Sequence, residues 1–334
     1  MESSSEVVVS AGSSAPALAP ERSGEWVRRL LPWVVTIAVL GWLLWPYRSG
    51  EGRAVLMQAF SRASAWTFVV GALGIVTMWI TDSYATARTF QRWRIALGLR
   101  PTLAIRGTGM MFDATNPTLG QAVLMLVVHR RGTPLSQALI VVMLMSAVFV
   151  QHIAIFSGIG LLGGATSEGG LVEAVVLSSL AMAAVYLLVI ALRPAFLAKY
   201  PICSWLMSAG LGGHAWAYLY RLPNMIAIIG TQALVMRGFG IELPLSVALF
   251  YLPAVIFITG VPLSVQGLGP GQVASVAFFA AYVQGDPAMA EATVVAASLA
   301  YAALLTLCAI LIGVCCLFTE TGRQTIALLR KPSR

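Results

Sequence analysis

The chain of 334 residues carries little charge. Only 10% of its residues are charged and 58% are hydrophobic, whereas soluble domains contain about 25% charged residues. This composition excludes an ordinary soluble domain. The sequence also lacks the alternating amphipathic segments of about ten residues that mark an outer-membrane barrel. What remains is a helical membrane protein.

Motifs of the common enzyme classes are absent as well. The sequence has no HExxH, GxSxG or P-loop pattern, and its four cysteines and three histidines show no metal-ligand spacing. We therefore expect no cofactor and no metal ion, and we name no catalytic residue. Whether the chain is an enzyme stays open at this point, with the balance against it.

The net charge of +8 does not indicate a nucleic-acid partner, because no module of interleaved basic and aromatic residues is present. The cations gather instead at the ends of apolar segments. Those after the second segment are Arg88, Arg92, Arg94, Arg100 and Arg106. Such clusters set the orientation of membrane proteins and lie on the cytoplasmic side. We therefore predict a protein of the cytoplasmic (inner) membrane with both termini in the cytoplasm. Arg88, Arg92 and Arg94 are candidates for contact with anionic headgroups.

Long apolar runs predict about six full transmembrane helices, since a crossing needs about 20 apolar residues. The expected spans are Leu30–Tyr47, Ser64–Thr81, Leu135–Ile159, Leu171–Leu192, Ala209–Met236 and Ala292–Phe318. Residues 1–25 are rich in Ser, Ala and Pro, which predicts a disordered tail. Residues 26–320 would then form a single transmembrane domain, followed by a basic cytoplasmic tail at 321–334.

Two further apolar regions are interrupted. Leu103–Val128 is broken by DATNPTLG (113–120), and Leu243–Val283 is broken by PLSVQGLGPGQ (262–272). Cations flank the first region on both sides, so we expect it to enter and leave the membrane by the cytoplasmic face, and the second region by the opposite face. The sequence therefore predicts an all-α polytopic fold with two opposed re-entrant hairpins. The order helix, hairpin, helix at 64–159 and 209–318 is typical of an inverted repeat.

The two breaks supply the candidate site. Non-helical backbone at membrane depth is tolerated only where it is buried in protein or lines a watery cavity. A helix beginning near Gly271 would direct unpaired N–H groups and its positive dipole end at the break, which suits a phosphate. The candidate lipid-binding residues are Gln266, Gly267, Gly269, Gly271 and Gln272 on one side, Asn116 and Gln121 on the other, and Arg221 and Asn224 in a neighbouring span. The alternative is a pair of packing turns whose amides are satisfied internally.

Three polar residues in apolar surroundings have competing interpretations. Arg221 lies in the middle of a predicted span, where an arginine costs about 2.5–3.5 kcal/mol on insertion scales. It either binds a phosphate, or the helix starts later, near Pro223, and Arg221 reaches the interface. Asp113 is either a proton-coupling carboxylate or a cap of the turn. His152 is either part of a proton relay or an interhelical hydrogen-bonding residue.

The same segments resemble a known family. PLSVQGLGPGQVASVAFF (262–279), RTFQRWRIALGL (88–99) and FDATNPTLGQAVLMLVVHRRGTPLSQAL (112–139) are similar to motifs of the lysylphosphatidylglycerol synthase transmembrane-domain family, also called flippase-like. The resemblance spans about residues 30–320. It implies a polytopic domain that moves or binds lipids with anionic or modified headgroups. Many relatives carry a charged pair after GLG, where this chain has Pro270, Gly271 and Gln272, so no role of that pair carries over.

Residues and resemblance together favour a lipid transporter or flippase-like protein that binds and translocates a phosphate-bearing lipid. The alternative is a membrane-embedded lipid-headgroup transferase, or the membrane subunit of one. Some relatives are fused to a soluble domain that aminoacylates phosphatidylglycerol, and because the sequence reaches only residue 334, soon after the last expected span, we expect no such domain here. A scaffold that binds lipid and docks a partner is a third hypothesis. The expected partners are anionic membrane lipids and a soluble synthase or membrane protein.

Overall fold

A computed structural model describes residues 25–113, 117–167, 170–261 and 264–330. In this part of the chain the structure is helical, apart from one isolated bridge between Ile241 and Val283. The helices are α1 (Glu25–Leu44), α2 (Gly50–Ser61), α3 (Ala65–Arg92), α4 (Leu99–Asp113), α5 (Pro117–Arg130), α6 (Leu135–Leu162), α7 (Leu171–Leu192), α8 (Ala195–Ala198), α9 (Pro201–Gly238), α10 (Leu245–Gly260), α11 (Pro270–Phe279), α12 (Pro287–Leu317) and α13 (Glu320–Arg330). Residues 1–24, which hold nearly all of the predicted disordered tail, lie outside the described residues.

The all-α polytopic architecture is confirmed. Within the described residues, five segments are long and apolar enough to cross a membrane: Leu30–Arg48, Ala65–Arg92, Leu135–Leu162, Val172–Leu192 and Pro287–Leu317. The predicted span Ala209–Met236 is not among these five. It belongs to α9, a helix of 38 residues that packs against α3 and bends at Gly210 (φ 60°, ψ 178°).

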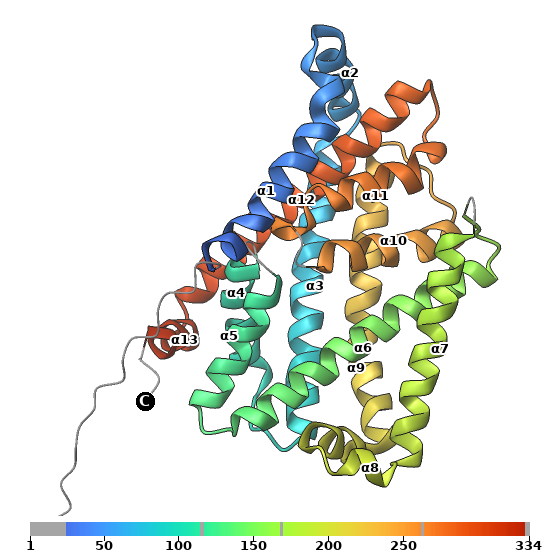
Figure 1. Cartoon of the computed structure of the whole chain (residues 1–334). Helices are drawn as coiled ribbons and strands as arrows, with labels where there is room; N and C mark the ends of the chain where they lie inside the picture. Colours follow the sequence, from blue (N-terminus) through green and yellow to red (C-terminus); the bar gives the residue numbers. More distant parts are fainter. Residues whose placement is uncertain (1–24, 114–116, 168–169, 262–263, 331–334) are drawn as a thin grey trace, which may run out of the picture.

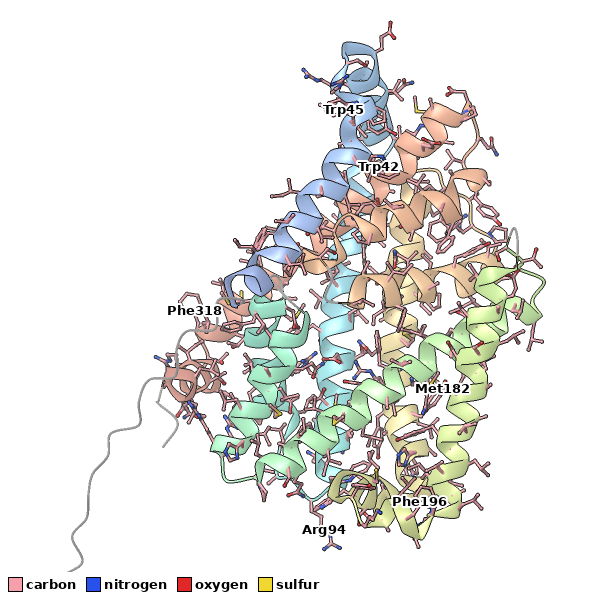
Figure 2. The ribbon with its side chains drawn as sticks, viewed as in Figure 1. Trp42, Trp45, Arg94, Met182, Phe196 and Phe318 are labelled. Carbon is pink, nitrogen blue, oxygen red and sulfur yellow. The ribbon has the colours of Figure 1, made fainter. Side chains whose placement is uncertain are left out.

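The two interrupted regions form helical hairpins: α4 and α5 run roughly along α3, whereas α10 and α11 run across the bundle (Figure 1). The first hairpin, α4 and α5, enters from the end of the bundle where α3 stops and α6 begins. Arg94 marks this end in Figure 2, and we call it the Arg94 end. The second hairpin, α10 and α11, enters from the opposite end. A short 3-10 turn at Val265–Gly267 lies in its break.

The packing of the helices repeats between the two halves, as an inverted repeat requires. Helices α3 and α9 pack on each other, α4 packs on α12, and α10 packs on α6. Each long helix therefore supports the hairpin of the other half. Two glycines allow this close approach: a Cβ on Gly160 of α6 would meet the backbone of Phe250 in α10, and a Cβ on Gly313 of α12 would meet Met111 in α4.

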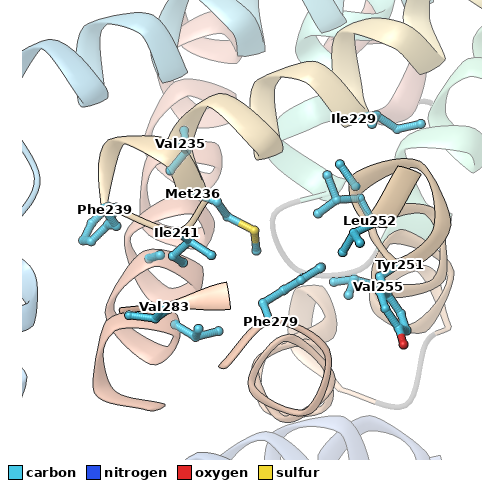
Figure 3. Packing of buried hydrophobic residues seen from close by; sticks show 14 of the residues in the cluster. Ile229, Val235, Met236, Phe239, Ile241, Tyr251, Leu252, Val255, Phe279 and Val283 are labelled. Carbon is cyan, nitrogen blue, oxygen red and sulfur yellow. The ribbon is translucent and has the colours of Figure 1, made fainter. Parts of the chain in front are cut away.

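The largest apolar cluster holds the second hairpin against the end of α9 (Figure 3). Met236 and Phe239 come from the end of α9, Leu252 from α10 and Phe279 from the end of α11. Phe239, Leu252 and Phe279 are completely buried. Because lipid is as apolar as these side chains, close packing rather than escape from water stabilises this contact.

Helices at both ends of the chain pack against the two hairpins. The Thr36 hydroxyl of α1 accepts a hydrogen bond of 2.8 Å from the Val265 N–H, so α1 covers the second break. Residues of the predicted C-terminal tail form α13, which packs against α4 and α5. Leu328 and Leu329 lie against the apolar cluster of the first hairpin, while Arg323 and Gln324 are exposed. This two-sided pattern explains why the segment is helical.

Candidate functional site

One carboxylate and two arginines form a buried cluster where α3, α4 and α9 meet. Arg106 Nε lies 2.6 Å from Asp82 Oδ2, and Arg221 Nη2 lies 3.4 Å from Asp82 Oδ1. The side chains of Asp82, Arg106 and Arg221 are only 13%, 10% and 9% exposed. We call these three residues the ion cluster. A single carboxylate thus serves two guanidinium groups.

Several donors of the ion cluster have no partner within the part of the chain that the structure describes. Among the described residues, no acceptor contacts Nη1 of Arg106 or Nε and Nη1 of Arg221. An unpaired buried donor costs about 1–3 kcal/mol, and a charged one more. An anion with several oxygens would satisfy these N–H groups with charge-assisted hydrogen bonds. The cluster is therefore suited to hold a phosphate or a carboxylate.

The ion cluster faces a cavity of about 450 Å³, which we call the central cavity. This volume is typical of small-molecule sites, about 300–1,000 Å³. Both hairpins contribute to its wall, with Gln121 from the first and Gln272 from the second. Apolar side chains complete it, among them Met78, Phe149, Ile228, Ile256 and Leu305. The cavity therefore combines a charged wall with apolar ones.

The structure brings six of the sequence-predicted residues together at the central cavity: Asp113, Gln121, Arg221, Asn224, Gly271 and Gln272. Two of them have fixed orientations. Asn224 Nδ2 donates to the Met78 carbonyl over 3.0 Å, and Gln272 Oε1 accepts the Gly269 N–H at 2.6 Å. Gln272 therefore caps its own helix while lining the cavity. At this helix end, where unpaired N–H groups were predicted, the Gly269 N–H is thus bonded within the hairpin.

Other predicted residues lie elsewhere. Gly267 and Gly269 have positive φ angles of 70° and 94°, but they face neighbouring elements. A Cβ on Gly267 would meet Thr259, and a Cβ on Gly269 would lie 2.8 Å from Val39 of α1. For these two glycines, the alternative interpretation of packing turns fits the structure. Asn116 and the side chain of Gln266 lie outside the described residues.

The structure gives the positions and contacts of the three polar residues that had competing interpretations. Arg221 lies inside α9, which continues through Pro223, so a helix start near Pro223 is wrong. Asp113 lines the cavity and also accepts the Gly120 N–H across the first break, at 2.9 Å. His152 is completely buried beside the Tyr218 ring, 3.7 Å between ring centres, and its Nδ1 bonds the Val148 carbonyl at 2.8 Å. It is not part of the described cavity wall.

The sequence of the chain matches the family described as the lysylphosphatidylglycerol synthase TM region over residues 33–313. The chain belongs to this family. The match includes both hairpins, the ion cluster and the whole described wall of the central cavity. A comparison with curated proteins gave no significant match. Membership in the synthase TM-region family associates the chain with membrane lipids and confirms it as an integral membrane protein.

The sequence analysis did not identify Asp82 as a candidate site residue. It also wrongly placed Arg106 with the cations of the cytoplasmic face. The second span was predicted to end at Thr81, but α3 continues to Arg92. Arg106 is 8% exposed and lies on α4, inside the first hairpin. The apolar surroundings of Arg106 in the sequence could have identified it, because a charged residue within an apolar membrane segment is a functional candidate by default.

The arginines predicted to contact headgroups lie at the end of α3. The Arg88 guanidinium lies over the Tyr84 ring at 5.3 Å, and that of Arg92 over the Trp216 ring at 5.6 Å. Arg94 follows directly and is exposed at the end of the bundle (Figure 2). These residues are separate from the ion cluster. Among the described residues, no three His, Cys, Asp or Glu side chains come close enough to hold a metal ion.

Proposed function

We propose that this chain binds a phosphate-bearing lipid, anionic or modified, and translocates it across the membrane, with the headgroup in the central cavity. The observation that carries the proposal is the ion cluster. Two arginines share Asp82 and hold three nitrogens without a partner among the described residues, at the wall of a cavity that both hairpins line. A lipid phosphate offers oxygens that match the planar guanidinium fork.

The surroundings of the ion cluster support a lipid rather than a small soluble anion. Most of the cavity wall is apolar, which suits the glycerol and acyl regions of a lipid. Opposed hairpins that approach a common site from both faces are a recurring plan of transporters. Arg106, Arg221, Gln121 and Gln272 would contact the headgroup, and Asp113 would serve proton coupling. We assign no role to His152.

The orientation forms part of the proposal. We place the Arg94 end and both termini in the cytoplasm of a cell bounded by an inner membrane, because cations concentrate in the loops at that end. Those of the described loops and adjoining helix ends are Arg92, Arg94, Arg100, Arg130, Arg131, Arg193 and Lys199, against Arg48, Arg53, Arg62 and Arg237 at the other end. The first hairpin would then open to the cytoplasm and the second to the opposite side.

A second candidate function follows from the family itself, whose description is the TM region of a lysylphosphatidylglycerol synthase. The chain would then present a lipid to a soluble transferase as its membrane subunit. In that case the central cavity would bind lipid without moving it across the membrane.

The test is a translocation assay with the purified chain in liposomes that contain acyl-labelled fluorescent phosphatidylglycerol, whose outer-leaflet label is bleached with dithionite. We expect Arg221→Gln to slow translocation by at least about tenfold, since a lost hydrogen bond to a charged group is worth about 1.5–3 kcal/mol. Arg237→Gln is the matched control, because Arg237 is an exposed arginine at the end of the same helix. Equal rates for wild type and Arg221→Gln at equal folded yield would refute the proposed site. Lipid retention without translocation by wild type would favour the membrane subunit.

A further inference from the structure

A second hollow, of about 550 Å³, lies at the Arg94 end, outside the central cavity. Its wall includes Arg92, Trp93 and Arg94 at the end of α3, and Trp205, Ala209 and Gly213 around the bend of α9. We call it the Arg94 hollow. It shares no described residue with the central cavity. The small side chains at the α9 bend leave the space that the hollow occupies.

The charge of the Arg94 hollow has one sign. Arg92 and Arg94 line it, and no acidic side chain does so among the described residues. Neither arginine forms an ion pair with any described carboxylate, since the ion pairs there belong to Asp82. Two unneutralised arginines beside an open hollow attract an anion.

The backbone at this end provides an independent observation. Within the described residues, the non-glycine positions with positive φ are Arg94 (58°) and Arg193 (48°), and both end a helix. Arg94 occupies the position after α3 that normally holds glycine: its N–H bonds the Gln91 carbonyl at 2.9 Å, and the Ile95 N–H bonds the Phe90 carbonyl at 3.0 Å. A left-handed conformation is unfavourable for arginine. A strained non-glycine residue of this kind is a candidate functional position.

Arg193 extends the cluster toward the same bend. Its Nη2 lies 2.9 Å from the point that a Cβ on Gly210 would occupy. Both strained arginines thus lie next to the α9 bend, one beside the hollow and one at Gly210. Trp205 and Trp216 are 39% and 45% exposed nearby. Exposed tryptophans of this kind lie at the level of lipid headgroups in membrane proteins.

We propose that the Arg94 hollow is a binding site for the phosphate of an anionic phospholipid in the leaflet at this end. Arg92 and Arg94 contact the phosphate, Trp205 covers the glycerol region, and Arg193 supports the bend. The interfacial tryptophans favour a lipid over a soluble phosphate compound. This site does not require translocation, and it is separate from the ion cluster.

The experiment uses the whole chain in nanodiscs of phosphatidylcholine doped with phosphatidylglycerol that carries a photoreactive headgroup, and cross-linked peptides are identified by mass spectrometry. We expect cross-links to the α9 segment at 205–213. Unlabelled phosphatidylglycerol should compete, whereas inorganic phosphate and glycerol phosphate in solution should not. Each arginine removed, by Arg92→Gln or Arg94→Gln, should weaken the cross-link by about fivefold.

Two controls separate this site from its surroundings. Arg237→Gln removes an exposed arginine at the opposite end of α9, outside the hollow, and should leave the cross-link unchanged. Arg221→Gln should also leave it unchanged while reducing translocation, so failure of this site and failure of the central cavity are distinguishable.

Arg94→Gly gives the sharpest outcome, because its two effects have opposite signs. Glycine adopts the left-handed conformation without strain, so the melting temperature should rise while the cross-link weakens. A lower melting temperature with a weaker cross-link would mean that Arg94 is structural. An unchanged cross-link in the double variant Arg92→Gln with Arg94→Gln would overturn the proposal. Competition by soluble phosphate would overturn its assignment to a lipid.

Discussion

Replacing Asp82 by alanine should destabilise the fold strongly. Asp82 is the described partner of both Arg106 and Arg221, and the two arginine side chains are 10% and 9% exposed. Alanine would leave two buried guanidinium groups without a counter-charge. Removing one partner of a buried ion pair costs about 3–5 kcal/mol, and here one deletion breaks two pairs. We therefore expect a loss of at least about 3 kcal/mol in the free energy of unfolding.

The measurement is reversible unfolding in mixed micelles by titration with sodium dodecyl sulfate, followed by circular dichroism. Asp286→Asn is the matched control: Asp286 is exposed and its Oδ1 caps α12 through the Met289 N–H at 3.0 Å. Asparagine also caps helices well, so this change should cost less than about 0.5 kcal/mol.

A double variant makes the test of the ion cluster more specific. Replacing Arg221 by methionine in the Asp82→Ala background removes one of the unpaired charges. The double variant should therefore be more stable than Asp82→Ala alone, because the two changes are not additive within one network. A cost below about 1 kcal/mol for Asp82→Ala, or a double variant less stable than the single one, would mean that water in the cavity solvates the arginines. The unpaired donors would then no longer identify an anion site.

Two further predictions concern the second hairpin and the orientation. Gln272→Met should lower the free energy of unfolding by about 1–3 kcal/mol, because it leaves the buried Gly269 N–H unpaired. Ser275→Ala on the same helix loses only a bond to the Gly271 carbonyl and should cost clearly less in the same unfolding titration. Equal costs would refute the capping role of Gln272. In a cysteine-free variant of the chain, new cysteines at the exposed positions Ser136 and Gln284 should react with a membrane-impermeant maleimide from opposite sides, Ser136→Cys from the cytoplasm, and labelling of both from one side would refute the opposed hairpins.

The positions of the helices were largely predictable, because hydropathy and helix breakers are local signals. Leu171–Leu192 was predicted with the bounds of α7, and the predicted start at Ala209 falls beside the bend at Gly210. The breaks at 113–120 and 262–272 were visible from Pro, Gly and amide residues. In each case a few neighbouring residues determine the local structure.

The partners across the breaks were not predictable, because they depend on residues distant in the sequence. Gly269 was recognised as a position of positive φ, but its neighbour is Val39 of α1, and Thr36 bonds Val265 over 229 positions. Asp82 was missed for a related reason. It follows directly after the apolar run that predicted the span, and its burial results from packing by α4 and α9 rather than from the hydropathy of its own segment.

The distribution of the ion cluster over the elements is informative. Asp82 and Arg221 lie on α3 and α9, which pack on each other, whereas Arg106 lies on α4 of the first hairpin. An ion pair of 2.6 Å therefore joins the hairpin to the central helix pair. An anion bound to the free N–H groups would compete with Asp82 for Arg106, because both are oxygen acceptors for one guanidinium group. Binding would thereby weaken the attachment of the hairpin at the cavity that we propose as the lipid site.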